Sequence, residues 1–181
     1  MQMHPALQIQ SMMKALTDVV LPAVDPANKL AQEQTRLVLG TLALMAQHLP
    51  LRFQFNCDEL TRLLKLAGIL RQVARGGPQT TVCVDKMALA ATSAVGTLER
   101  GQAGPAVIEQ AVRDMRAVTS QVVRSIYIDG DEAALKQVEG AVLTVSRDQL
   151  LRDRSWMLMQ GWEPDPQAIP KIQDLLEARA A

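Results

Sequence analysis

Histidine and cysteine are the residues of this chain best suited to metal binding, and their spacing gives no metal-binding motif. The chain holds two of each, His4 and His48, and Cys57 and Cys83. A di-iron site in a helical bundle needs glutamate three residues before each histidine, and methionine stands at both positions. No HxxxH, HExxH or close cysteine pair occurs either. The sequence therefore predicts no metal and no other cofactor.

The two cysteines could act as nucleophiles. They are too few for a disulfide framework, so Cys57 and Cys83 are expected to be free thiols. Each lies near a predicted helix start, where the helix dipole favours the thiolate. Asp58 and Glu59 directly follow Cys57 and oppose its ionisation. We expect two small apolar residues, buried or half-buried, with a redox-active or nucleophilic thiol as the alternative.

Three further polar residues, His48, Asp18 and Glu33, are candidates for acid–base chemistry. His48 ends a predicted helix, where the dipole favours a cation. Asp18 and Glu33 lie beside apolar stripes, and a carboxylate buried there without a partner would have a raised pKa. The simpler expectation places both on a solvated edge and gives His48 a structural role. No GxSxG or Ser–His pattern supports nucleophilic catalysis.

The sequence gives only weak support for anion or nucleic-acid binding. The chain has no GxxxxGK[ST] or GxGxxG loop. Arg100 opens the stretch RGQAGP before a predicted helix, whose backbone N–H groups could bind an anion, although an ordinary interhelical turn is the simpler interpretation. The 19 basic residues balance 19 acidic ones, and the arginines of RDQLLRDR at 147–154 stand beside aspartates, as on a solvated edge. Neither nucleic acid nor an anionic membrane surface is an expected partner.

The segment SWMLMQGWEPDP, which starts at Ser155, holds both tryptophans. Trp156 and Trp162 would point about 120° apart on a continuous helix. Because glycine and proline end the helix there, we expect Trp162 to fold back and plug the core. A partner or dimer surface and an apolar pocket, both including Met159, are the alternatives. Phe53 and Phe55 belong to the same candidate set, and we expect them to enter the core from an extended connector.

Helical spacing of Leu, Val, Ala and Met runs through almost the whole chain. Proline, glycine and capping residues divide it into helices. The predicted helices run from Pro5 to Pro22, from Pro26 (capped by Asp25) to Pro50, from Asn56 to Gly76, from Thr80 or Thr81 to Gly101, from Pro105 to the turn Asp129-Gly130-Asp131, from Asp131 to as far as Met159, and from Pro166 or Pro170 to Ala180.

These elements predict an all-α fold. We expect one domain over residues 1–181, a bundle of five to seven helices with short connections. The short C-terminal helix, about 166–180, is expected to pack back on it. The longest apolar stretch, from Leu37, has ten residues, against about 20 for a membrane-spanning helix. Since no secretory signal opens the chain, a cytoplasmic protein is expected.

Association is the first functional hypothesis: the protein binds a second copy of itself, as in a homodimer, or another protein. The small-residue run from Ala88 and the long helix from Asp131 would both suit close helix packing. The second hypothesis is a module that binds an apolar small molecule between helices. The third, an enzyme without a local motif, is less expected than the first two.

Overall fold

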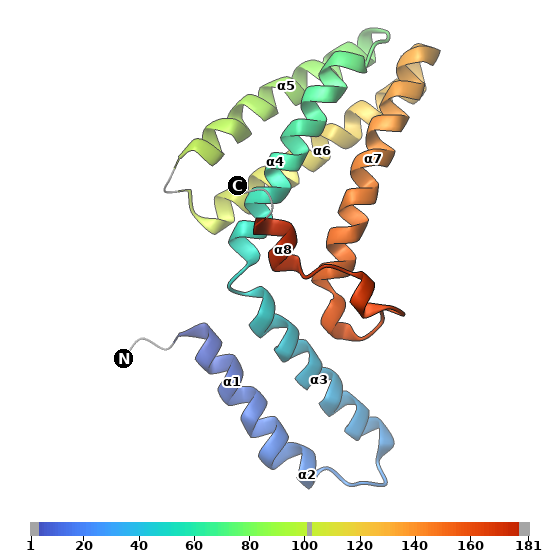
Figure 1. Cartoon of the computed structure of the whole chain (residues 1–181). Coiled ribbons are helices and arrows are strands. Elements are labelled where there is room, and N and C mark those ends of the chain that lie inside the picture. Colours follow the sequence, from blue (N-terminus) through green and yellow to red (C-terminus); the bar gives the residue numbers. More distant parts are fainter. Residues whose placement is uncertain (1–3, 101–102, 178–181) are drawn as a thin grey trace. The chain divides into compact units, whose positions relative to one another are not determined.

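The computed structural model describes residues 4–100 and 103–177, and this part of the chain is helical, without a strand (Figure 1). The all-α prediction is therefore confirmed for the described residues. The elements are α1 (Pro5–Ala15), a π-helical turn (Leu16–Val20), α2 (Leu21–Ala23), α3 (Lys29–His48), α4 (Arg52–Val73), α5 (Pro78–Glu99), α6 (Pro105–Asp129), α7 (Glu132–Trp156), two 3₁₀ turns (Leu158–Gln160 and Pro166–Ala168) and α8 (Ile172–Glu177).

Contacts within the chain divide it into two compact units. The first, called here the hairpin unit, comprises residues 4–52 and 153–177 of the described chain. The second, the core unit, comprises residues 53–152 and contains α5, α6 and nearly all of α4 and α7. One domain over 1–181 stays a prediction.

The core unit has an aliphatic interior, as the scarcity of aromatic residues predicts. One side of each helix supplies buried leucine, isoleucine, valine, methionine or alanine at three- and four-residue spacing. The buried cluster comprises Leu60, Leu63, Leu66, Ala67, Leu70, Ala74, Met87, Ala94, Ile108, Val112, Met115, Val122, Ile126, Ala134 and Val138.

Two connections of the core unit touch each other at one end of the bundle. Gly76, between α4 and α5, pairs with Gly130, between α6 and α7, in an isolated bridge. A Cβ atom on Gly76 would lie 2.7 Å from the carbonyl oxygen of Asp129, and one on Gly130 would lie 2.5 Å from that of Ile126. At Gly76 only glycine lets the two connections approach this closely. At Gly130 a side chain would collide with the preceding turn of α6.

Asp129 at the end of α6 caps the start of α5. Its carboxylate accepts hydrogen bonds from the backbone N–H of Gln79 (2.7 Å) and of Thr80 (3.0 Å). The predicted cap at Thr80 or Thr81 is wrong, because α5 begins earlier, at Pro78. Proline suits this first position, and the orphan N–H groups take their acceptor from a distant residue.

The hairpin unit pairs α1 and α2 with α3. The predicted stop at Pro22 is wrong by one residue: the helix continues to Ala23, and the π-helical turn stands before the proline. Proline has no backbone N–H to donate, and the wider π-helical turn lets the helix tolerate the missing hydrogen bond. The predicted cap at Asp25 is also wrong. Its carboxylate accepts from Ala27 N (2.9 Å) in a local turn, and Asn28 caps α3.

The extended connector predicted around Phe53 and Phe55 is a helix. α4 begins at Arg52, four residues before the predicted cap Asn56. A helix satisfies its own backbone polar groups, whereas a five-residue strand needs a partner. Phe53 is 44% exposed and does not enter the core, while Phe55 is half-buried.

The C-terminal segment contains shorter helical elements than predicted. α7 ends at Trp156, three residues before Met159, and the described part of the last helix is α8. The predicted end at Ala180 lies outside the described residues. Within the hairpin unit, the Ser155 hydroxyl donates a 2.7 Å hydrogen bond to the Pro170 carbonyl, which ties the segment to the end of α7.

Candidate functional site

The hairpin formed by α1, α2 and α3 leaves nine of its large apolar side chains exposed. Of the described residues up to Arg52, only Ile9 is buried. Two helices can bury one side of each other and leave the flanking apolar positions open. The exposed large apolar residues of this hairpin are Leu7, Met12, Val19, Val20, Leu30, Leu37, Val38, Met45 and Leu49.

On α3 these residues form a continuous stripe. Helical geometry places Leu30, Leu37, Val38, Met45 and Leu49 within a sector of about 120°. From Leu37 to His48, α3 contains no Asp, Glu, Lys or Arg. Surface helices of a monomer usually carry charge, and the centres of protein interfaces are depleted of it. We call this face the α3 stripe.

The tryptophan segment does not form the predicted core plug. Trp162 is 75% exposed and Met159 is also exposed. Trp156 is half-buried and stacks on His48 of α3, with ring centroids 3.8 Å apart. Of the candidate set, Trp156, Met159 and Trp162 belong to the hairpin unit, and Phe53 and Phe55 belong to the core unit.

His48 links α3 to the end of α7 within the hairpin unit. Its Nε2 lies 2.7 Å from the carbonyl oxygen of Trp156, so the neutral ring carries its proton on Nε2 and donates it. Burial lowers the pKa of His48 below its usual value, and the hydrogen bond to Trp156 opposes this in part. A structural role for His48 stays a prediction, and this contact is consistent with it.

The strongest electrostatic cluster of the core unit was not predicted. Arg152 of α7 is 1% exposed and forms ion pairs with Glu59 and with Asp58 (3.0 Å), both on α4. Its guanidinium also lies 4.3 Å from the ring centre of Phe55. Glu59 pairs further with Arg116 of α6, at 2.8 Å. The expectation of a solvated edge is thus wrong for Arg152.

No local signal could have identified this cluster. Arg152 stands 93 residues from Glu59, and beside Asp153 it resembles any solvated pair. Glu59 stands three residues after Asn56, a spacing that predicts a capping pair at a helix start, but it lies well inside α4. The cluster joins α4, α6 and α7, and its charges are balanced by one another. Removal of one member would therefore leave a buried charge with fewer partners.

The thiols lie where small apolar residues are expected. Cys57 and Cys83 are free, half-buried and packed against the core cluster. Cys57 is not at a helix start, since α4 begins five residues earlier. Burial raises the pKa of Cys57, which disfavours the thiolate that a nucleophile requires.

The two candidate carboxylates lie on the surface. Asp18 is exposed and pairs with Lys14 at 2.7 Å. Glu33 is exposed and lines a shallow depression of about 230 Å³ with Pro26 and Arg36. Asp18, Glu33 and His48 belong to the hairpin unit, where their described contacts are with other residues, and Cys57 belongs to the core unit.

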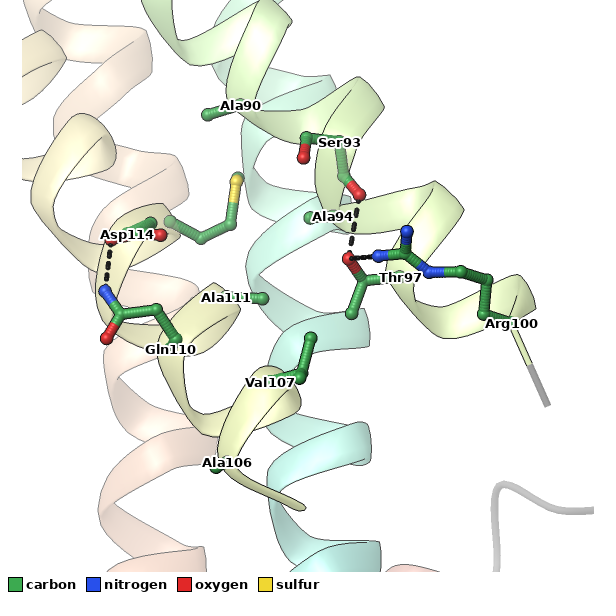
Figure 2. Close-up of a pocket in the computed structure, with 11 residues that line it drawn as sticks. Ala90, Ser93, Ala94, Thr97, Arg100, Ala106, Val107, Gln110, Ala111 and Asp114 are labelled. Atoms are coloured by element: carbon green, nitrogen blue, oxygen red, sulfur yellow. Dashed lines mark hydrogen bonds between the residues drawn. The ribbon is translucent and has the colours of Figure 1, made fainter. Parts of the chain in front are cut away.

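A cleft lies between α5 and α6 in the core unit (Figure 2). Its volume is about 480 Å³, within the range of about 300–1,000 Å³ typical of ligand sites. Short side chains leave this space open beside the buried Met115, and Arg100 and Asp114 lie on opposite sides of the view (Figure 2). The lining residues are Ala90, Ser93, Ala94, Thr97, Arg100, Ala106, Val107, Gln110, Ala111, Asp114 and Met115.

The polar groups of the cleft are engaged mainly with each other. Arg100 donates to the Thr97 hydroxyl (2.9 Å), which itself donates to the Ser93 carbonyl (3.0 Å). Gln110 donates to Asp114 at 2.8 Å. The cleft thus combines an apolar lining of alanine, valine and methionine with one basic residue, Arg100, and one acidic residue, Asp114.

Among residues 4–100 and 103–177, no group of three or more histidine, cysteine or acidic side chains is arranged to hold a metal ion. None of the helices in this part of the chain is long and apolar enough to span a bilayer. Comparisons with protein-family models, with curated proteins and with solved structures found no match to this chain.

Proposed function

We propose that the protein acts by association and that the hairpin of α1, α2 and α3 supplies the contact surface. The observation that carries the proposal is the contrast within this hairpin. It buries Ile9 alone among the described residues up to Arg52, while nine of its large apolar side chains are exposed. Exposed apolar surface of this extent is costly in water unless a partner covers it.

The charge distribution supports a protein partner. The second half of the α3 stripe has no ionic side chain, so a charged ligand would find no counter-ion there. An apolar helical surface is the natural complement, because helices bind in grooves and stripes through residues at three- and four-residue spacing.

Photo-crosslinking in the intact cell tests this function. Benzoyl-phenylalanine placed at Leu37 should give one protein adduct of defined mass, and Met45→Asp on the same stripe should abolish it. The matched control places the crosslinker at Arg36, the exposed neighbour outside the stripe, where no adduct is expected. Adducts of equal yield at both positions, or no adduct at Leu37, would contradict the proposal.

A second candidate function is the binding of an apolar small molecule, which the cleft between α5 and α6 favours. Met115 and Met87 both belong to the buried core cluster, but only Met115 lines the cleft. Methyl-labelled methionine therefore provides a direct probe: octanoate should shift the Met115 signal and leave Met87 unchanged. Ser93→Leu should fill the opening and abolish the shift, and Thr92→Leu, one residue before it, should not.

A further inference from the structure

We infer that the partner of the α3 stripe is a second copy of this chain, with two α3 helices packed antiparallel about a two-fold axis. This rests on the proposed function and names the partner of the same surface. Three features of α3 lead to it: the exposed apolar area, the order of residues along the stripe, and the position of the charges.

The first feature is area. Nine apolar side chains of the hairpin are each between 41% and 67% exposed. The five that form the α3 stripe share one side of their helix, and they supply a substantial part of the ~800 Å² that each partner of a stable interface buries. Two hairpins that share this surface form a four-helix arrangement, which closes an apolar interior that one hairpin cannot close.

The second feature is the order of residues, which reads nearly the same in both directions. The centre of the stripe runs Leu30, Gln34, Leu37, Thr41 and Met45, with Val38 beside Leu37. An antiparallel pair centred between positions 37 and 38 sets Leu30 opposite Met45 and Gln34 opposite Thr41. Apolar residues then face apolar ones, and polar residues face polar ones.

Thr41 fits this arrangement. Its hydroxyl donates a 2.9 Å hydrogen bond to the Leu37 carbonyl of its own helix, so burial leaves no donor unsatisfied. Its oxygen can still accept from the amide of the facing Gln34. A polar pair at one level of an apolar seam fixes the register, since any shift would leave a buried polar group unpaired.

The third feature is charge, which selects the antiparallel direction. The ionic residues of α3, namely Lys29, Glu33 and Arg36, all lie in its N-terminal half. A parallel pair would place each at the level of its own copy, like charge beside like charge. An antiparallel pair places them level with the uncharged half of the partner and brings opposite ends of the two helix dipoles together.

The test uses Leu37→Cys in a Cys57→Ala/Cys83→Ala background, with Arg36→Cys as the matched control. Light scattering gives the mass, circular dichroism verifies the helix content, and maleimide labelling gives thiol access. The expected result is a dimer in which Cys at 37 reacts at least about tenfold more slowly than Cys at 36, because labelling then requires dissociation. Mild oxidation should join two copies at position 37. A mixture of Gln34→Cys and Thr41→Cys chains should form the mixed disulfide in preference to either symmetric one.

Other results separate the partner from the function. A monomer whose thiol at position 37 reacts rapidly would refute the inference that the partner is a second copy. It would leave the proposed association with a different protein intact. A monomer with a protected thiol at 37 overturns both, since the rest of the chain then covers the stripe. A dimer whose thiol at 37 reacts as fast as that at 36 overturns this interface.

Discussion

The guanidinium of Arg152 and the carboxylate of Glu59 form a buried ion pair that joins α7 to α4 inside the core unit. Asp58 on α4 and Gln149 on α7 complete the surroundings of the arginine, at 3.0 Å and 2.7 Å. A buried pair of this kind is costly to break, because Glu59 then keeps its buried charge with only the half-exposed Arg116 to balance it.

Replacement of Arg152 by methionine is the first prediction. The variant should lower the free energy of unfolding of the core unit by about 3–5 kcal/mol, since Glu59 keeps a buried charge. Urea denaturation followed by circular dichroism measures the change. Arg147→Met on the same helix, at an exposed position, should stay within about 0.5 kcal/mol of the parent. Equal effects of the two substitutions would refute the role given to the cluster.

Alanine substitution at Gly130, in the turn before α7, and at Gly140, within α7, should change the stability of the protein in opposite directions. At Gly130 a Cβ atom would lie 2.5 Å from the Ile126 carbonyl oxygen, so Gly130→Ala should cost about 1–3 kcal/mol. Gly140 lies within α7 with open space around it. Gly140→Ala should therefore raise the free energy of unfolding by about 0.5–1 kcal/mol, because alanine favours the helix. Thermal denaturation of the two variants measures both signs.

Asp129 should make the core unit sensitive to acid. The Thr80 hydroxyl, with the backbone N–H groups of Gln79 and Thr80, lowers the pKa of Asp129. A carboxyl with a lowered folded-state pKa stabilises the fold above its unfolded-state pKa of about 3.9 and loses that contribution as the pH falls through the folded value. Asp129→Asn should be less stable at neutral pH and lose less stability on acidification. Urea midpoints at pH 7 and at pH 3 measure this, and parallel losses in the two proteins would contradict it.

His48 should titrate below its usual pKa, and Trp156 should report the titration. Burial favours the neutral imidazole, so this contact contributes fully above about pH 6.5 and weakens as the pH falls through the lower folded value. In a Trp162→Phe background, the fluorescence of Trp156 should fall on acidification, because the stacked imidazolium quenches it. The midpoint should lie below 6.5, and His48→Gln should remove the transition. A midpoint at or above 6.5 would show that burial does not control this histidine.

The helices of the core unit were largely determined by local sequence. Proline at the first position of α6 and the turn at Gly130 bound a helix whose apolar spacing is regular, and both predicted limits are correct to within a residue. These signals act within one or two turns of chain, through φ restriction, capping and burial of one side. The same holds for the end of α3 near Pro50.

The tertiary structure decided which residues far apart in sequence are in contact. The cap on α5 comes from Asp129, and the charge of Arg152 is balanced by Glu59, 93 residues away. Trp162 faces outward, although its type and spacing favour burial. In each case the free energy depends on which groups the fold brings within hydrogen-bond or van der Waals distance, and residue type alone does not contain that information. The sequence by itself determined where helices form and which side of each is apolar, while the packing decided which of those apolar sides were covered.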